Sequence, residues 1–315
     1  MQMIILLIFL IIFILWLLFT IHSFYLGYFV YKIGSPGKPK TKNNERILRR
    51  LQGRDENTPF KFIVLGDVQS SFRNLHELAC LNGEKNISFV IQTGDLVSHA
   101  DEGHYSLLLH ELDKYSALSF LVVPGNHDIK GGKFLYENYL GLKQYYFFFH
   151  RCLFIVMDNS LGPPYSTQFQ WLKETLNENF YKAKHTFVFM HREPIEWERG
   201  EPHPALDDYN PFFQLLQNFQ VDYVFSGHLH DYQRIERLRT VFISNGLVSK
   251  MDGFMKINPS YITLVEVNAD RIQDTRIPVY QGFTNRLYGC YLDASVAHFY
   301  PWLKKLSNSL FRFKD

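Results

Sequence analysis

Side chains that could bind a metal ion are concentrated in five short blocks of the sequence. The blocks are Gly66-Asp67-Val68-Gln69, Gly94-Asp95, Gly125-Asn126-His127-Asp128, His191 and Gly227-His228-Leu229-His230. Their Asp, Asn, Gln and His side chains offer oxygen and imidazole donors suited to Zn, Fe or Mn. All blocks but the His191 block begin with glycine, which allows the backbone to turn sharply beside an ion. These residue types and spacings indicate a metal centre without thiolate ligands.

Each block follows an apolar run with the composition of a buried strand. These runs lie at 60–65, 89–92, 120–123, 185–190 and 221–225. In an open α/β sheet, ligands gather in the crevice beyond the carboxyl ends of the strands. We therefore expect all five blocks to converge on one place. Two metal ions held there about 3.5–4 Å apart need a bridging carboxylate and a nearly symmetric set of ligands. A hydroxide bridging the two ions can then attack phosphorus in line.

The ordered series GD-x-Q, GD, GNHD, H and GH-x-H resembles the signature of the calcineurin-like metallophosphoesterase superfamily, over about residues 60–250. The resemblance implies an α/β fold, a calcineurin-like four-layer αββα sandwich, with two divalent or mixed-valence metal ions (Mn, Fe or Zn). It implies that the first metal is held by Asp67, Gln69, Asp95 and His230, and that Asp95 bridges. It assigns the second metal to Asn126, His191 and His228. It also places His127 near the leaving-group oxygen, as an acid or a charge stabiliser.

Single residues of the series also have simpler interpretations. Asp67 and Asp95 are residue types favoured as helix caps, and Asn126 alone suits a turn. Asp128 is expected to be a structural hydrogen-bond acceptor rather than a ligand. Arg192 would contact a substrate phosphate or form a surface salt bridge, and we favour the salt bridge. The ordered set as a whole favours the metal centre.

Two positions depart from the pattern of the superfamily. Gln69 stands where many members have His, and its neutral carboxamide is a poorer donor, so the first site is expected to bind its ion more loosely or to prefer a harder ion such as Mn. Ser98 stands where the protein Ser/Thr phosphatases have an Asp that orients the catalytic His. Purple acid phosphatases have a Tyr ligand at that same position. The chain therefore resembles neither branch.

The elements around these blocks alternate between short β-rich runs and helical patterns, which indicates an α/β domain with a buried sheet. Helical patterns lie around 74–81, 104–115, 168–176 and 211–219. Further strands are predicted at 145–149, 153–156, 241–244, 261–267 and 271–279. The last three runs follow one another without predicted helices between them.

The N-terminus is apolar without a break from Met3 to Phe19, long enough for a transmembrane helix. A cleaved signal peptide is the alternative, but a basic leading region and a small-residue cleavage site are missing. Eight Lys and Arg residues follow between 32 and 54, so the positive-inside rule predicts a single-pass membrane protein with a cytoplasmic catalytic domain. We expect an anchor at 1–31, a basic juxtamembrane linker at 32–58, the metallophosphoesterase domain at 59–283 and a C-terminal tail at 284–315.

The C-terminal tail has apolar residues at helical spacing, with basic residues beside them. They are Phe299, Trp302, Leu303, Leu306 and Leu310. This pattern predicts a helix that either packs on the domain or lies on an anionic membrane surface. The sequence leaves both possibilities open.

Composition and charge limit the possible functions. The formal net charge is +2 and the three cysteines form no CxxC pair, so neither a nucleic-acid partner nor a thiolate zinc site is expected. The leading hypothesis is metal-dependent hydrolysis of a phosphorylated small molecule or a lipid-linked phosphate or pyrophosphate. The alternative is a catalytically weak or inactive membrane-anchored metal-binding protein that binds a partner through the same cleft.

Overall fold

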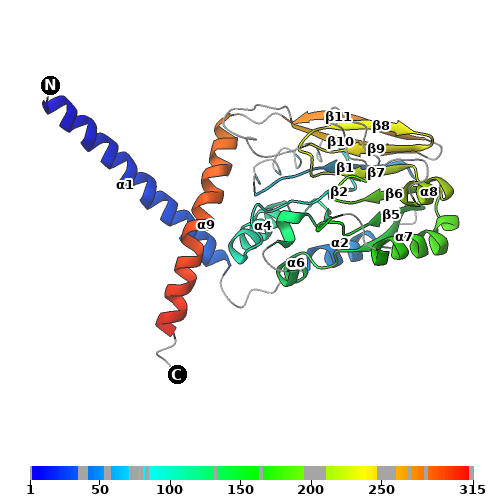
Figure 1. Ribbon diagram of the computed structural model, residues 1–315, viewed down its shortest axis with the longest axis horizontal. Helices are drawn as coiled ribbons and strands as arrows, with labels where there is room; N and C mark the ends of the chain where they lie inside the picture. Colours follow the sequence, from blue (N-terminus) through cyan, green and yellow to red (C-terminus); the bar gives the residue numbers. More distant parts are fainter. Residues whose placement is uncertain are drawn as a thin grey trace.

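A computed structural model describes most of the chain, and the fold is that of a layered α/β protein. The described residues are 2–34, 42–52, 58–70, 72, 75, 78, 81, 85–115, 117–130, 133–162, 166–194, 211–246, 260–268, 271–279 and 283–311. Two mixed β sheets pack face to face and helices cover their outer faces (Figure 1). The predicted four-layer αββα sandwich is confirmed.

The first sheet has the strand order β11-β10-β1-β2-β3. Strands β1 (Phe60–Leu65), β2 (Phe89–Gln92) and β3 (Phe120–Val122) are parallel to one another. β10 (Ser260–Val267) and β11 (Ile272–Val279) continue the sheet in antiparallel fashion beyond β1. The three parallel strands therefore end at the same edge of the sheet, where three of the predicted ligand blocks begin.

The second sheet has the strand order β4-β5-β6-β7-β9-β8. Its parallel centre comprises β5 (Cys152–Val156), β6 (His185–Phe189), β7 (Tyr223–Ser226) and β9 (Thr240–Ser244). The two antiparallel edges are β4 (Tyr145–Phe149) and β8 (Gln233–Arg237). The sequence analysis missed β8 because its side chains are mostly exposed and polar, as an edge strand allows.

Phenylalanine rings fill the space between the two sheets. Phe62 stacks on Phe89 at a centroid distance of 5.2 Å within the first sheet, and Phe154 stacks on Phe187 at 4.9 Å within the second. Phe62 also meets Phe154 edge to face across the interface at 5.4 Å. Offset-stacked and edge-to-face arrangements are those that aromatic pairs prefer. This rigid core fixes the two sheets, and therefore the ends of their strands, relative to each other.

Helices cover the outer face of each sheet. On the first sheet lie α4 (Glu102–Lys114), α6 (Lys133–Tyr139) and part of α9 (Phe283–Phe311). On the second sheet lie α7 (Ser166–Asn179), extended by η1 (Phe180–Lys182), and α8 (Pro211–Asn218). The short helix α5 (Asn126–Ile129) follows β3 directly. The predicted helix at 74–81 lies largely outside the described residues.

The N-terminal helix α1 (Gln2–Ile33) projects from the domain and contacts α9, which crosses it (Figure 1). In the described part of the chain it is the one helix long and apolar enough to cross a membrane, and its most apolar window is entirely unburied. Near the crossing, a Cβ at Gly27 would overlap Phe299, so glycine permits the close approach. The C-terminal helix thus packs on the rest of the chain, although Trp302 and Leu306 stay exposed.

A short helix, α2 (Asn43–Leu51), lies within the segment that the sequence analysis treated as a linker. Ile47, Leu48 and Leu51 are buried in the core between the sheets. Asn44 is fully buried and bonds the backbone of the edge strand β3: its Nδ2 donates to Val122 O at 3.0 Å and its Oδ1 accepts from Val122 N at 3.0 Å. The helix therefore seals the open edge of the first sheet. The glycine- and proline-rich stretch at 35–39 lies outside the described residues.

Replacing Asn44 by alanine should destabilise the protein strongly. Asn44→Ala leaves the backbone of Val122 and of Leu142 without its buried partner, which should cost about 2–4 kcal/mol in the free energy of unfolding. Denaturant unfolding of the detergent-solubilised protein measures this loss. Arg49→Ala, on the exposed face of the same helix, is the control and should change stability by about 0.5 kcal/mol or less. Equal effects of the two substitutions would contradict the role assigned to Asn44.

Candidate metal centre

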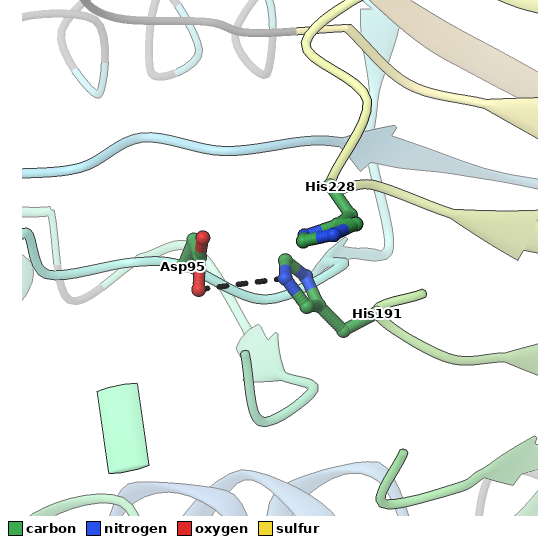
Figure 2. A group of neighbouring side chains, drawn as sticks. All are labelled: Asp95, His191 and His228. Carbon is green, nitrogen blue, oxygen red and sulfur yellow. Dashed lines mark ion pairs between the residues drawn. The ribbon is translucent and has the colours of Figure 1, made fainter. Parts of the chain in front are cut away.

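The predicted ligands gather where the parallel strands of both sheets end. Asp67 follows β1, Asp95 follows β2 and Asn126 opens α5 just after β3. His191 follows β6, and His228 follows β7. Figure 2 shows Asp95, His191 and His228 pointing toward one another from separate loops. The convergence expected from the sequence is therefore what the fold produces.

The residues assigned to the second metal lie within bonding range of a common point. His191 Nε2 is 2.9 Å from Asn126 Oδ1 and 3.5 Å from Asp95 Oδ1. Asp95, His191 and His228 each offer a ligand atom, and these three atoms lie within 4.8 Å of one another. The rings of His191 and His228 meet edge to face at 5.0 Å. Asp95 thus lies together with the residues assigned to the second metal.

The residues assigned to the first metal also lie together. Gln69 Nε2 is 3.2 Å from His230 Nε2, and His230 Nε2 is 3.7 Å from Asp67 Oδ1. The other oxygen of Asp67 accepts a hydrogen bond from the backbone N–H of His228 at 2.9 Å. This bond ties the first set to the second. The structure therefore brings all seven predicted ligands into one cluster, and their binding of metal stays a prediction.

The donors fit a cation because the pocket has more acceptors than protons. Asp67 Oδ1 is buried and has no hydrogen-bond partner among the described residues. His191 Nδ1 lies 2.9 Å from the carbonyl oxygen of Thr93, so Nδ1 carries the ring proton. The lone pair of His191 Nε2 then faces the oxygens of Asn126 and Asp95. A bound cation satisfies this set of electron pairs, which are costly to bury alone.

The pKa shifts of the clustered side chains also favour the binding of a cation. Burial, followed by the nearby charge of Asp95, raises the pKa of Asp67 well above its usual range. Burial lowers the pKa of His191, and burial with the neighbouring His191 and Arg192 lowers the pKa of His228 to about 4. Both imidazoles are therefore neutral near pH 7, and each has one ring nitrogen with a lone pair, which in His228 is the Nε2 that accepts from Arg192.

The backbone around the ligands is held in unusual conformations. The φ angle is 44° at Gln69, 57° at Asp95, 72° at His228 and 60° at His230. These values lie in the left-handed region that residues other than glycine adopt uncommonly. A Cβ at Gly125 would overlap the backbone and carboxylate of Asp95. Strain of this kind persists only where the surrounding structure enforces it, and it clusters at functional sites. The loops therefore adopt backbone conformations that cost local stability and that direct the candidate ligand side chains toward one another.

Asp128 supports the loop that holds Asp95. Its carboxylate accepts from the backbone N–H groups of Leu96 at 2.9 Å, Val97 at 3.0 Å and Gly125 at 2.9 Å. The prediction that Asp128 is a structural acceptor is confirmed. Asn159 has a similar supporting role, which the sequence analysis missed: its Oδ1 accepts from the backbone N–H groups of His191 and Arg192. Its place just after β5 was the available signal.

Two further side chains stand at the open side of the cluster. The His127 side chain is 42% exposed, and its Nε2 lies 3.9 Å from Asp95 Oδ2. Its Nδ1 lies 2.9 Å from the carbonyl oxygen of Ser98, so Nδ1 carries a proton and donates it. Arg192 donates from Nη1 to His228 Nε2 at 2.9 Å, a contact that was not predicted. An imidazole and a guanidinium therefore lie beside the candidate ligands.

The fold and the site define a class of protein, and comparison with known proteins identifies the family. A family model described as calcineurin-like phosphoesterase matches residues 60–232, more than half of the 315 residues. The chain belongs to the calcineurin-like phosphoesterase family. A comparison with curated proteins gave no match.

Solved structures share this fold at low sequence identity. A dimetal phosphatase from Danio rerio aligns with a TM-score of 0.52 at 15% identity, over 70% of this chain and 99% of that one. A Plasmodium protein described as GAP50, the anchor in the inner membrane complex, gives 0.51 at 16% identity, over 76% and 95%. A Staphylococcus aureus protein described as a 5′-nucleotidase gives 0.52 at 16% identity, over 76% and 58%. These likenesses establish the fold.

The raised pKa of Asp67 predicts how pH affects the metal-free protein. A carboxyl whose pKa is higher in the folded state gives stability that is full below its unfolded pKa, about 3.9, and is lost as pH rises through the folded pKa. We therefore expect chelator-treated wild type to lose melting temperature, relative to Asp67→Asn, as pH rises from about 5 to 8. Saturating Mn²⁺ should stabilise wild type and remove this loss.

Thermal melts of the two proteins across this pH range measure the effect. Taking the difference between them cancels the contributions of His191 and His228, whose lowered pKa values give the opposite sign. A pH-independent difference in the metal-free state would contradict the electrostatic role of Asp67.

Proposed function

We propose that this chain is a membrane-anchored, metal-dependent phosphoesterase that hydrolyses a phosphate ester or a pyrophosphate. The observation that carries the proposal is that the seven candidate ligands lie in one cluster, which includes the buried Asp67 Oδ1 that has no hydrogen-bond partner among the described residues. Family membership and the likeness to a dimetal phosphatase support it.

The seven candidate ligands would form two sets, one for each cation. Asp67, Gln69, Asp95 and His230 would hold one cation, and Asn126, His191 and His228 would hold the second beside the bridging Asp95. When bound, Mn, Fe or Zn ions would supply Lewis-acid activation of a water molecule and charge neutralisation of the phosphate.

His127 and Arg192 complete the arrangement. His127, with Nδ1 held by the Ser98 carbonyl, presents Nε2 to protonate the leaving-group oxygen. Arg192 stands beside His228, where its guanidinium is placed to bind a phosphate oxygen.

Removing one central ligand should abolish turnover. His228→Ala should lower kcat on an aryl phosphate monoester or diester by about a thousandfold or more, since the second cation loses an imidazole. Assays of the full-length protein in detergent with Mn²⁺ measure this change. His150→Ala is a matched control, because His150 bonds the Thr58 carbonyl at the far end of the sheets and should leave kcat unchanged. Full activity of His228→Ala would overturn the assignment.

A second candidate function is partner binding without catalysis. The neutral Gln69 in the first ligand set favours it, and the Plasmodium protein of this fold is described as an anchor. Metal analysis separates the two candidates. One bound ion or none, with no turnover on any phosphoester, would favour the binding protein.

The membrane would be the setting of the reaction. We propose that α1 crosses the bilayer once and that the catalytic domain is cytoplasmic, as its Lys- and Arg-rich following segment favours. The exposed stretch of α1 runs from Met3 to Phe19, where the ring of Tyr291 on α9 packs against Phe19 at 4.7 Å. Trp302 and Leu306, exposed on α9, would then lie near the lipid headgroups. This placement favours a lipid-linked phosphate or pyrophosphate over a soluble substrate.

A double substitution on α9 tests the substrate class. In nanodiscs, Trp302→Ser/Leu306→Ser should raise KM for a lipid pyrophosphate by roughly tenfold, because lost apolar contacts with lipid weaken access to the surface substrate. KM for a water-soluble analogue with the same headgroup should not change. The exposed Asn308→Ala is the control on the same helix. Equal changes for both substrates, or higher kcat/KM for the soluble analogue in wild type, would contradict a lipid substrate.

A further inference from the structure

Two hydrogen bonds connect the exposed His127 to the C-terminal helix. His127 Nδ1 donates to the carbonyl oxygen of Ser98 at 2.9 Å, and the hydroxyl of Ser98 donates to Asp293 Oδ1 on α9. We propose that Asp293 is a positioning residue for His127, acting through Ser98. The proposal rests on the function proposed above, in which His127 protonates the leaving group.

The ring of His127 depends on the Ser98 carbonyl for its orientation. A carbonyl oxygen only accepts hydrogen bonds, so Nδ1 carries a proton and Nε2 faces the pocket; the imidazolium form has a second proton on Nε2, and this is the proton that passes to the leaving-group oxygen. The ring is 42% exposed and sits on the short helix α5. Movement of the Ser98 carbonyl would therefore move the proton donor.

Ser98 in turn is held from two sides. Its backbone N–H donates to Ser70 Oγ at 3.0 Å, and the two hydroxyl oxygens lie 2.9 Å apart. The Ser98 hydroxyl also donates to the carboxylate of Asp293, which is 10% exposed, and it lies 3.3 Å from His99 Nδ1. Asp293 comes from a helix that also contacts α4 and α1. The loop after β2 is thus pinned by an element from outside the sheets.

Asp293 is itself fixed by a buried histidine. His104 Nε2 lies 3.1 Å from Asp293 Oδ1, and His104 Nδ1 lies 2.7 Å from Asp101 Oδ2, at the N-cap of α4. His99, His104 and Asp293 also have the donor types of a metal site. However, both nitrogens of His104 face carboxylates at hydrogen-bond distance, so the imidazolium is the cation of this cluster. The cluster therefore serves to position Asp293.

The same turn of α9 holds the membrane helix. Tyr291, two residues before Asp293, contacts His22 Nδ1 at 2.7 Å and Ser23 Oγ at 2.9 Å through its hydroxyl. Phe24 of α1 meets Phe299 of α9 edge to face at 5.8 Å. The contacts that hold α9 against α1 and the hydrogen bond between Ser98 and Asp293 therefore involve the same turn of α9. The membrane anchor is therefore linked to His127 through the side chains of Tyr291, Asp293 and Ser98.

The leaving group of the substrate separates positioning from simple stability. A nitrophenolate leaves without protonation, whereas an alkoxide needs a proton from His127. In full-length protein in nanodiscs with Mn²⁺, Asp293→Ala should lower kcat on an alkyl phosphate by about tenfold or more and on nitrophenyl phosphate by less than about threefold, with KM unchanged. Asp293→Asn keeps an acceptor for Ser98 and should recover most of the alkyl kcat. Lys304→Ala, which removes the bond between α9 and Glu102 of α4 and leaves Asp293 and Ser98 in place, should lower Tm without changing the alkyl-to-aryl ratio.

A spectroscopic readout tests the proposal without turnover. In metal-free protein labelled with ¹⁵N-histidine, His127, assigned by comparison with His127→Gln, should show a single Nδ1-protonated tautomer in wild type. Asp293→Ala should convert it to a mixture of tautomers. Equal loss of kcat on both substrates, or an unchanged His127 tautomer in Asp293→Ala, would overturn the role of Asp293. Failure of the proposed function would give a different result, because wild type would then hydrolyse neither substrate. The tautomer measurement would still test whether Asp293 positions His127.

Discussion

The structure depends on burying acidic groups next to neutral imidazoles. Asp67 is fully buried and Asp95 is 1% exposed, and His191 beside them is also fully buried. Carboxylates in such a place are stable only when protonated, hydrogen-bonded or paired with a cation. Asp67 has one oxygen bonded to the His228 backbone and the other without a partner. Bound cations would resolve this imbalance, and the candidate ligands on the surrounding loops are placed where they could hold them.

The fold supplies the rigidity that this arrangement needs. Parallel strands from two sheets end together, and stacked phenylalanines such as Phe62 and Phe154 lock the sheets to each other. On this base the loops can hold left-handed backbone conformations at Asp95 and His228. Asp128 then uses its whole carboxylate to fix the loop after β2. Strain at the ligands is therefore offset by hydrogen bonds and packing elsewhere.

The sequence was informative where local pattern and function coincide. The runs before Asp67 and Asp95 have the bounds of β1 and β2, because buried parallel strands are continuous apolar segments. The candidate ligands could be proposed because their blocks follow such runs closely. The edge strand β8 was missed because its side chains are mostly polar and exposed. The helix α2 was missed because its apolar stripe of Ile47, Leu48 and Leu51 lies in a short basic segment that was interpreted as a linker.

Contacts between distant parts of the chain could not be read from local pattern. Nothing near Asp293 in the sequence indicates that its carboxylate meets Ser98, because that contact exists only when α9 packs on α4 and α1. Likewise, the bond from Arg192 to His228 depends on how two neighbouring strands end. The sequence shows that Ser98 departs from the superfamily pattern. Only the structure shows that the Ser98 hydroxyl donates to Asp293.

The most direct test of the metal centre is crystallographic. Anomalous diffraction from crystals grown with Mn²⁺ locates each bound ion independently of activity. We expect two peaks about 3.5–4 Å apart, one beside Asp67 and His230 and the other beside Asn126 and His191, with Asp95 between them. A single peak, or no peak among these residues at saturating Mn²⁺, would contradict the two-metal centre.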